Sequence, residues 1–155
     1  MQPGDLPVTA AISATVHGRY AEDQAVYAER LALYPAGCAV YLRDDAIVGF
    51  LVSHPWHRDA PPALGALLGA IPADADTYYF HDIAILPGAR GSGAGREAVA
   101  LVARQARIAG QDEITLIAVS SADRYWTRHG FTRVAGRDEP YGPGTCVMHR
   151  IVRPA

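Results

Sequence analysis

A glycine-rich stretch, residues 88–96, has the composition of an anion-binding loop. It reads Gly-Ala-Arg-Gly-Ser-Gly-Ala-Gly-Arg, with three glycines in the five residues from Gly91 to Gly95. Glycine lets the backbone turn tightly and brings unshielded N–H groups close to a ligand. A helical pattern follows from Arg96, and the first turn of a helix offers unpaired N–H groups and positive potential. The stretch therefore predicts a site for a phosphate-bearing ligand.

A strand before this loop and a helix after it would hold the loop in place. Residues 78–86 are mostly apolar and aromatic, which is typical of a buried strand, and Pro87 ends it because proline cannot donate to a ladder. Beyond Arg96, apolar residues recur on one helical face and Gly110 supplies a C-terminal stop. The residues of that face are Val99, Val102, Ala103 and Ala106.

Three kinds of site use such a loop. A P-loop needs a Gly-Lys-Ser/Thr ending, and this chain contains no lysine. A dinucleotide fingerprint has Gly-x-Gly-x-x-Gly near the start of a βαβ unit, which this spacing does not match. The pattern Arg90-x-x-Gly93-x-Gly95 resembles motif A of the GCN5-related N-acetyltransferase (GNAT) superfamily, where the loop cradles the pyrophosphate of acetyl-CoA. A nucleotide-binding module using the same loop is the alternative from another class.

The resemblance implies which residues bind acetyl-CoA. In the superfamily the central strand and the next one splay apart, and pantetheine pairs with exposed main chain of the central strand. This implies main-chain contacts from Ile83, Ile85 and Leu86. The implied pyrophosphate contacts are Arg90, Gly91, Ser92, Gly93, Ala94, Gly95 and Arg96. No metal is implied.

Amine acetylation also needs a group that removes a proton from the amine. His81 is the leading candidate, because an unperturbed imidazole titrates near pH 6.5, and residues 81–85 resemble His-Ala-Leu-Ala-Val of the arylalkylamine branch. A half-buried strand histidine without a catalytic role is an equally open interpretation. Asp82 is the second candidate base, or a structural carboxylate that accepts helix N–H bonds.

The leaving thiolate needs a proton or a hydrogen-bond donor. The family pattern Ala-x-x-Phe-Tyr-x-x-x-Gly-Phe matches residues 122–131, but Trp126 stands at the usual tyrosine position, and Val119 stands where an asparagine is common. An indole N–H can donate a hydrogen bond but cannot release a proton at useful pH. Tyr125 is therefore the candidate acid, unless it faces the core.

Length and composition bound the rest. A chain of 155 residues, half of them hydrophobic, predicts one folded domain over residues 1–155. A net charge of -2 gives no electrostatic case for nucleic acid or an acidic membrane. We expect a cytoplasmic protein, because no signal peptide or membrane-length apolar run is present. Cys38 and Cys146 match no disulfide or metal spacing, and His54 and His57 lack a third ligand nearby.

The element order predicted along the chain is α-α-β-β-β-α-β-α-β-β. Helices are expected over residues 5–17, with Asp5 as N-cap, and over residues 22–34; a hairpin follows at 38–42 and 46–52. Residues 53–77 would form a lid that contains a short helix at 63–69. A strand at 113–119, a short helix capped by Ser120 or Ser121, and a strand pair at 131–134 and 145–151 complete the order.

This order resembles the GNAT fold: an α/β (α+β) protein with a central mixed, mostly antiparallel sheet flanked by helices. Its first strand would be missing or very short, which leaves a sheet edge that a homodimer could cover. The resemblance implies an N-acetyltransferase that moves acetyl from acetyl-CoA to a primary amine by direct attack in a ternary complex. A small-molecule amine is favoured because the lid would narrow the cleft. The alternatives are a protein N-acetyltransferase and an acyl-CoA-binding sensor with little turnover.

Overall fold

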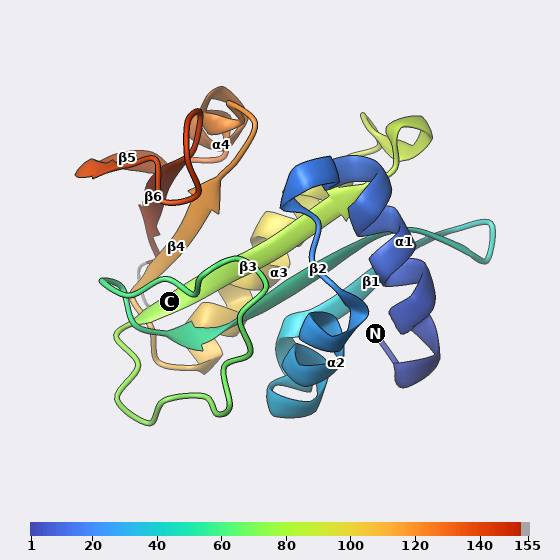
Figure 1. The fold of residues 1–155 in the computed structure, drawn as a ribbon, viewed down its shortest axis with the longest axis horizontal. Helices are drawn as coiled ribbons and strands as arrows, with labels where there is room; N and C mark the ends of the chain where they lie inside the picture. The colour runs from blue at the N-terminus through green and yellow to red at the C-terminus, as the bar shows by residue number, and fades with distance from the viewer. Residues whose placement is uncertain (153–155) are drawn as a thin grey trace.

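The computed structural model of the protein describes residues 1–152, which form one six-stranded sheet (Figure 1). Across the sheet the order is β1-β2-β3-β4-β6-β5. The β3–β4 pair is parallel and the other described pairs are antiparallel, so the mixed, mostly antiparallel sheet expected from the sequence is confirmed. The strands are β1 (Cys38–Arg43), β2 (Ala46–Trp56), β3 (Thr77–Ile85), β4 (Glu113–Ala118), β5 (Thr132–Asp138) and β6 (Cys146–Ile151).

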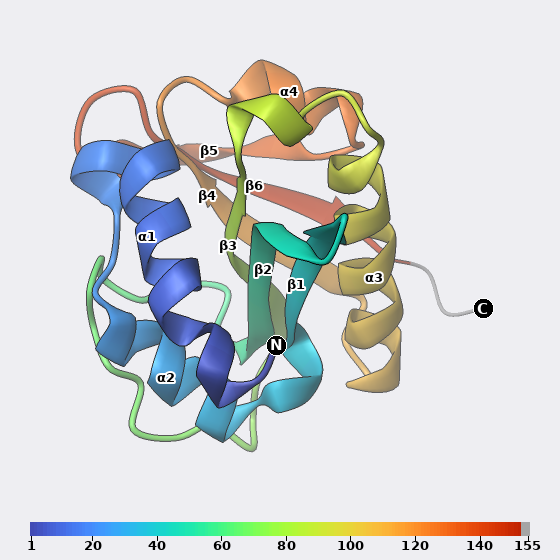
Figure 2. The same ribbon diagram turned by 90° about the vertical axis from the view of Figure 1, so that its right-hand side faces the viewer.

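Helices cover both faces of this sheet. Helices α1 (Leu6–His17) and α2 (Gln24–Leu33) lie on one face and α3 (Ala94–Ile108) on the other, as Figure 2 shows. The short helix α4 (Asp123–Arg128) follows β4. The predicted inner residues of α3, which are Val99, Val102, Ala103 and Ala106, are all buried, and they pack against Tyr78, Ile114 and Met148. On the other face Tyr27 and Leu31 of α2 pack against Phe50 and Val52.

The parallel strands β3 and β4 separate after a short contact. They pair at Tyr78 with Ile114 and at Tyr79 with Thr115, although β3 continues to Ile85 and β4 to Ala118. Over its full length β4 pairs with β6 on its other side. The two strand ends therefore leave a wedge, and the splay that the resemblance implied is present.

The segment between β2 and β3 differs from the prediction. Ser53 to Trp56 belong to β2 and Thr77 to β3, so the connection is residues 57–76, which we call the closing segment. The predicted helix at residues 63–69 is wrong. Turns occupy this stretch, because Gly65 and Gly69 adopt φ of 76° and 75°, which a right-handed helix does not allow.

Of the two predicted helix caps, that of α4 is wrong and that of α1 is confirmed in position. Ala122, rather than a serine, is the N-cap of α4, and both serines before it adopt positive φ, 52° at Ser120 and 57° at Ser121. Asp5 occupies the N-cap position of α1, but its carboxylate makes no capping bond and accepts the N–H of Gln2 at 2.7 Å.

The β1 strand is an edge of the sheet. No strand precedes α1 within residues 1–152, as expected, and the N-terminal ammonium of Met1 donates to the carbonyl of Cys38 at 3.3 Å. Cover of this edge by a second copy stays a prediction. Near Gly49 the β1–β2 register shifts, and a Cβ added at Gly49 would lie 2.8 Å from the Ala84 oxygen. None of the described helices has the length and apolar character of a membrane span.

Candidate active site

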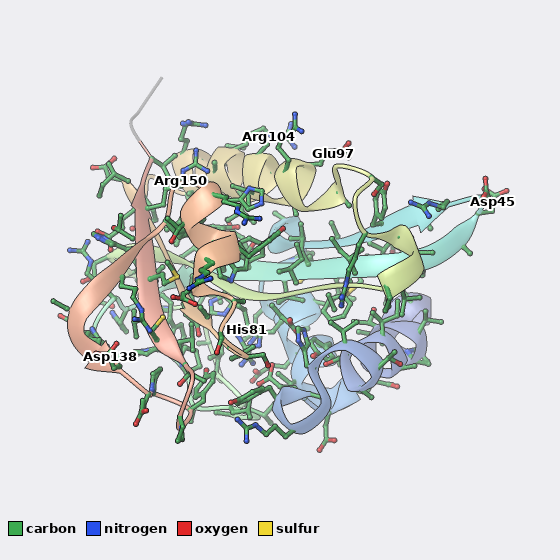
Figure 3. All side chains as sticks on the ribbon, turned by 90° about the horizontal axis from the view of Figure 1, so that it is seen from above. Asp45, His81, Glu97, Arg104, Asp138 and Arg150 are labelled. Carbon is green, nitrogen blue, oxygen red and sulfur yellow. The ribbon has the colours of Figure 1, made fainter. Side chains whose placement is uncertain are left out.

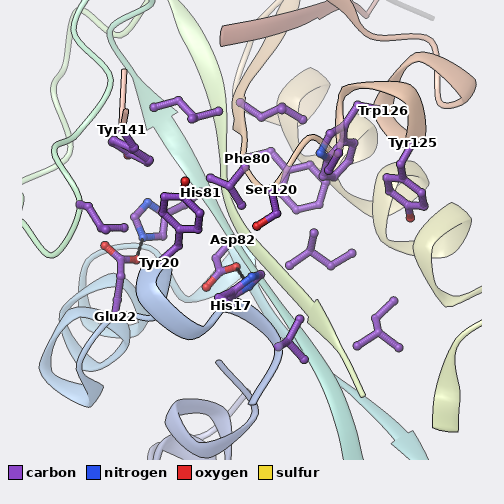
Figure 4. Close-up of a pocket in the computed structure, with 18 of the residues that line it drawn as sticks. His17, Tyr20, Glu22, Phe80, His81, Asp82, Ser120, Tyr125, Trp126 and Tyr141 are labelled. Carbon is purple, nitrogen blue, oxygen red and sulfur yellow. Dashed lines mark hydrogen bonds and ion pairs between the residues drawn. The ribbon is translucent and has the colours of Figure 1, made fainter. Parts of the chain in front are cut away.

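A cavity of about 480 Å³ fills the wedge between β3 and β4. One end is lined by Ile85, Arg90 and Tyr125, next to the glycine loop. The other end is lined by side chains from α1, the turn before α2 and the closing segment. Residues at this second end include His17, Tyr20, Glu22, Leu64, His81, Asp82 and Tyr141 (Figure 4). Figure 3 places His81 in the interior, far from Asp45 at the hairpin tip.

The glycine loop has the geometry of an anion cradle. Gly91 and Gly93 adopt φ of 78° and 92°, and α3 begins directly afterwards. The amides of residues 91–95 donate no hydrogen bond to other residues in the described part of the chain. Ser92 turns its hydroxyl inward, where it donates to the Ala89 carbonyl at 2.8 Å. The loop therefore offers main-chain N–H groups, as a pyrophosphate requires.

Arginine side chains lie near the glycine loop and near α4. Arg90 lines the cavity and donates through Nε to the Ile85 carbonyl at 3.3 Å. Burial, then the charges of Arg150 and Arg96, lower the pKa of His129. Two guanidinium groups therefore act on one imidazole beside α4, and the same field would favour the phosphates of an acyl-CoA.

The three strand residues expected to pair with pantetheine differ in their availability. Ile83 and Ile85 line the cavity. Leu86 does not, because its N–H donates to the Val48 carbonyl at 2.9 Å and its own carbonyl accepts the N–H of Ala89 at 2.9 Å. The carbonyl of Ile85 is also engaged, by Arg90 Nε, and His17 bonds to the main chain of Ile83. Position on the cavity wall is therefore what distinguishes Ile83 and Ile85 from Leu86.

His81 is held by a carboxylate that sequence reasoning missed. Its Nε2 lies 2.7 Å from Oε2 of Glu22, and the two side chains are 3% and 5% exposed. The other ring nitrogen, Nδ1, is buried and has no hydrogen-bond partner within residues 1–152. Glu22 follows α1 by only a few residues and is 59 positions from His81, so no local motif could have joined them.

His54 lies beside His81 but is a buried core residue. The ring centroids are 5.7 Å apart, and His54 Nδ1 donates to the Pro55 carbonyl at 3.0 Å. Burial and the nearby His81 lower the pKa of His54 to about 3, so it stays neutral. His57 is on the surface, 3.7 Å from Asp74. Among the described residues no three His, Cys, Asp or Glu side chains gather as a metal site would require.

Asp82 forms a separate pair with His17. Asp82 Oδ1 lies 2.7 Å from His17 Nε2, and the Tyr27 hydroxyl donates to Oδ2 at 2.7 Å. Burial opposes charge on both groups, but their mutual hydrogen bond and attraction outweigh it. The pKa of His17 is therefore raised, and the pKa of Asp82 is lowered. Asp82 is thus an ionised carboxylate with a hydrogen-bond donor on each oxygen. This arrangement favours a structural role over proton transfer.

We expect Asp82→Asn to lower the free energy of unfolding by about 1.5–3 kcal/mol, the usual worth of a charged hydrogen bond. The pKa of His17 is raised on folding, so its contribution to stability is full below the unfolded pKa of about 6.5 and is lost as the pH rises further. The pKa of Asp82 is lowered on folding, so its contribution is full above the unfolded pKa of about 3.9 and is lost at lower pH. The difference between wild type and variant should therefore peak between these values in urea titrations. A difference that stayed constant up to pH 9 would contradict the ion pair.

Helix α4 presents Tyr125, not Trp126, toward the glycine loop. Trp126 is 7% exposed and packs against Phe80 and Phe131, with both ring centroid distances at 5.4 Å. Tyr125 is 40% exposed and lines the cavity; its hydroxyl would be 2.0 Å from a Cβ added at Gly95. The expectation that Tyr125 could face the core is therefore wrong, because the larger indole fills that space.

The closing segment is fixed from both sides of the cavity. Gly65 N–H donates to Glu22, and the amides of Leu68 and Gly69 donate to Glu29. From the opposite side the Tyr141 hydroxyl donates to the Pro62 carbonyl at 2.6 Å. Hydrogen bonds thus tie the segment to α2 and to the β5–β6 connection, across the second end of the cavity, which we call the acceptor end because the proposal below places the acceptor there.

Sequence reasoning missed several residues of this end. His17, Glu22 and Tyr141 enter from three distant parts of the chain, and no short motif contains them. Ser120 also lines the cavity, and its hydroxyl points toward Asp82 in Figure 4. The sequence held a weak signal for Ser120 alone, because two consecutive serines follow a buried strand. In the structure both serines adopt positive φ, a strained conformation that is often found at functional sites.

Comparisons with known proteins agree with this architecture. The GphF GNAT-like decarboxylase in complex with isobutyryl-CoA is 18% identical, covers 99% of this chain and 97% of its own, and has a TM-score of 0.79. The loading GNATL domain of CurA from Lyngbya majuscula is 14% identical with coverages of 98% and 95% and a TM-score of 0.82. The ribosomal-protein-S18-alanine N-acetyltransferase from Escherichia coli is 14% identical, with coverages of 100% and 92% and a TM-score of 0.70.

These likenesses concern the fold, because the identities are low. A sequence search of the curated proteins finds no match. Residues 10–131 match the family model of the Acetyltransferase (GNAT) family, which spans most of the chain and includes the glycine loop, β3 and α4. The resemblance inferred from Arg90, Gly93 and Gly95 is therefore confirmed, and this protein belongs to the GNAT acetyltransferase family.

Proposed function

We propose that this protein transfers an acetyl group from acetyl-CoA to the primary amine of a small molecule, by direct attack in a ternary complex. One observation carries the proposal: a single cavity runs from Arg90 and Tyr125, beside the glycine loop, to the His81–Glu22 pair. The glycine loop would hold the pyrophosphate, and Ile83 and Ile85 would hold pantetheine. The thioester supplies the acyl group, while the protein orients the amine and removes its proton.

A small acceptor suits the acceptor end better than a protein chain. The closing segment lies over this end and is tied on both sides, by Glu22 and by Tyr141. The side chains here are largely aromatic and acidic, and Arg30 of α2 is buried against Glu29 rather than open to a ligand. A positively charged amine therefore fits this surface better than a carboxylate-bearing one.

In this proposal His81 is the base, Asp82 supports the site through His17, and Tyr125 donates a proton to the leaving thiolate. Burial raises the pKa of Tyr125, so the hydroxyl keeps its proton at neutral pH. We expect Tyr125→Phe to lower turnover by about 10²-fold, the lower end of the usual contribution of a general acid or base. The Kd for acetyl-CoA should not change. Unaltered turnover in a thiol-release assay would mean that the thiolate leaves unaided.

The proposal is tested by thiol release with a panel of amines, using acetyl-CoA and isobutyryl-CoA as donors. Turnover with a small amine and acetyl-CoA is the expected result, with amino acids and peptide N-termini as poorer acceptors. Thermal shift with acetyl-CoA, CoA, ATP and NAD tests the loop separately. Stabilisation by the CoA compounds without any turnover would favour the second candidate, an acyl-CoA sensor. The observation behind that candidate is Trp126, which occupies the tyrosine position and is buried.

A further inference from the structure

Glu22 links His81 to the closing segment through one buried carboxylate. Its Oε2 lies 2.7 Å from His81 Nε2, and its Oε1 accepts the Gly65 N–H at 2.7 Å. Both oxygens thus have an N–H donor, and the side chain is 5% exposed. An ionised carboxylate can only accept hydrogen bonds, so the proton of the shared bond belongs to the imidazole.

This contact determines which nitrogen of His81 can act as a base. With the proton on Nε2, the neutral ring has its free lone pair on Nδ1. Nδ1 is buried and has no partner within residues 1–152, and Figure 4 shows this side of the ring turned toward Tyr141. A buried polar atom without a partner is costly, which indicates a ligand atom as its partner in function.

The other charged and titratable groups around His81 are compensated or neutral. Asp82 on β3 is paired with His17 of α1, and Arg30 of α2 is paired with Glu29. Burial and the nearby His81 keep His54 of β2 neutral, and burial raises the pKa values of the neighbouring tyrosines. These tyrosines are Tyr79 and Tyr141. Glu22 is therefore the negative group that contacts this imidazole.

We propose that Glu22 is a positioning residue that holds Nε2–H of His81, so that Nδ1 takes the proton of the attacking amine. The inference rests on the proposed function. In the step, the amine N–C bond forms and the thioester C–S bond breaks. One proton moves from the amine nitrogen to Nδ1 of His81, and the CoA thiolate takes one proton from the Tyr125 hydroxyl. The proton on His81 then returns to Tyr125 through solvent, so the reaction is balanced. Because Glu22 also holds Gly65, the same carboxylate connects the base to the closing segment.

Glu22→Gln tests this, with Glu29→Gln as the matched control. Glu29 also holds the closing segment, at 2.7 Å from Leu68 N and 2.9 Å from Gly69 N, but does not contact His81. The side-chain amide that Glu22→Gln introduces can donate to Nε2, which would move the ring proton to Nδ1 and block the base. We expect Glu22→Gln to lower kcat about 10²-fold and to move the rising limb of the pH–rate profile to lower pH, because a neutral amide no longer stabilises the protonated ring.

The control separates this role from simple fixation of the segment. Glu29→Gln should raise KM for the amine while leaving the pH–rate profile as in the wild type. It should also lower the free energy of unfolding, because Glu29 is the carboxylate partner of the buried Arg30. Equal changes in both variants, without a shift of the profile in Glu22→Gln, would overturn the inference. Inactivity of the wild type itself would instead reject the proposed function. Both variants should keep the thermal shift with acetyl-CoA, which confirms folding.

A second measurement is made on the wild-type protein and does not require an active variant. Nitrogen-15 NMR of the wild-type imidazoles, with His81 assigned from the spectrum of His81→Gln, reports which ring nitrogen carries the proton. A proton on Nε2 is expected. A neutral ring protonated on Nδ1 would overturn the inference even if Glu22→Gln were inactive.

Discussion

We expect Gly95→Glu to abolish the stabilisation that acetyl-CoA should give to the wild-type protein. At one hundred times its Kd, a ligand that binds only the folded state adds about 2.7 kcal/mol to the free energy of unfolding. A side chain at Gly95 would enter the glycine loop and would bring a carboxylate to the site proposed for the pyrophosphate. Its Cβ would also lie 2.0 Å from the Tyr125 hydroxyl. Calorimetry at a temperature where the variant stays folded measures the loss.

Gly93→Val should lose binding for a different reason. Gly93 is the N-cap of α3 with φ of 92°, and a β-branched residue is strained there although no atom lies within 4 Å of its Cβ position. Gly88→Ala is the matched control, because Gly88 has no positive φ and also has open space around it. Gly88→Ala should bind acetyl-CoA like the wild type. Normal affinity in Gly93→Val or Gly95→Glu would refute the assignment of the loop.

A double variant shows whether the cradle or Tyr125 causes the effect at Gly95. Gly95→Ala adds only a methyl group, whose clash is with the Tyr125 hydroxyl; the next ring atom, Cζ, is at 3.3 Å. If displacement of Tyr125 weakens binding, Gly95→Ala combined with Tyr125→Phe should recover most of the affinity. If the methyl group fills the cradle itself, the double variant should bind as poorly as Gly95→Ala.

The strand, loop and helix around the cradle could be predicted because their signals are local. Pro87 ends β3, the glycines supply the positive φ values, and the apolar face of α3 shows the helical period in the sequence. Tyr125 and Trp126 could not be oriented in the same way. Adjacent residues in a short helix differ by about 100°, and the core space between Phe80 and Phe131 decides which ring enters it.

The acceptor end could not be predicted because its contacts join distant parts of the chain. Glu22 and His81 are 59 residues apart, and His17 and Asp82 are 65 apart. Each histidine–carboxylate pair forms because α1 and α2 pack on the sheet beside β3. Strict strand alternation would put the neighbours His81 and Asp82 on opposite faces of the sheet. The β2–β3 register shifts at this point, between Val52 and Ser53, and both side chains meet partners from the α1–α2 side.

We expect His81→Ala to lower turnover by roughly two to four powers of ten, the usual share of a general base. The rising limb of the pH–rate profile should disappear with the imidazole. Affinity for acetyl-CoA should barely change, because His81 lies upstream of Ile83 and Ile85, the strand residues proposed to hold pantetheine. Steady-state kinetics from pH 5 to 9, together with calorimetry of acetyl-CoA, measure both quantities.

The structure adds a control that separates a base from a structural histidine. His81→Ala leaves the buried carboxylate of Glu22 without its donor, which can disturb the site by itself. His81→Gln keeps an N–H that can donate to Glu22 but cannot take a proton from the amine. Loss of turnover in both variants supports the base. Loss in His81→Ala alone would assign His81 a structural role. An unchanged pH–rate profile in either variant would leave Asp82, or the free-amine fraction of the substrate, to account for the pH dependence.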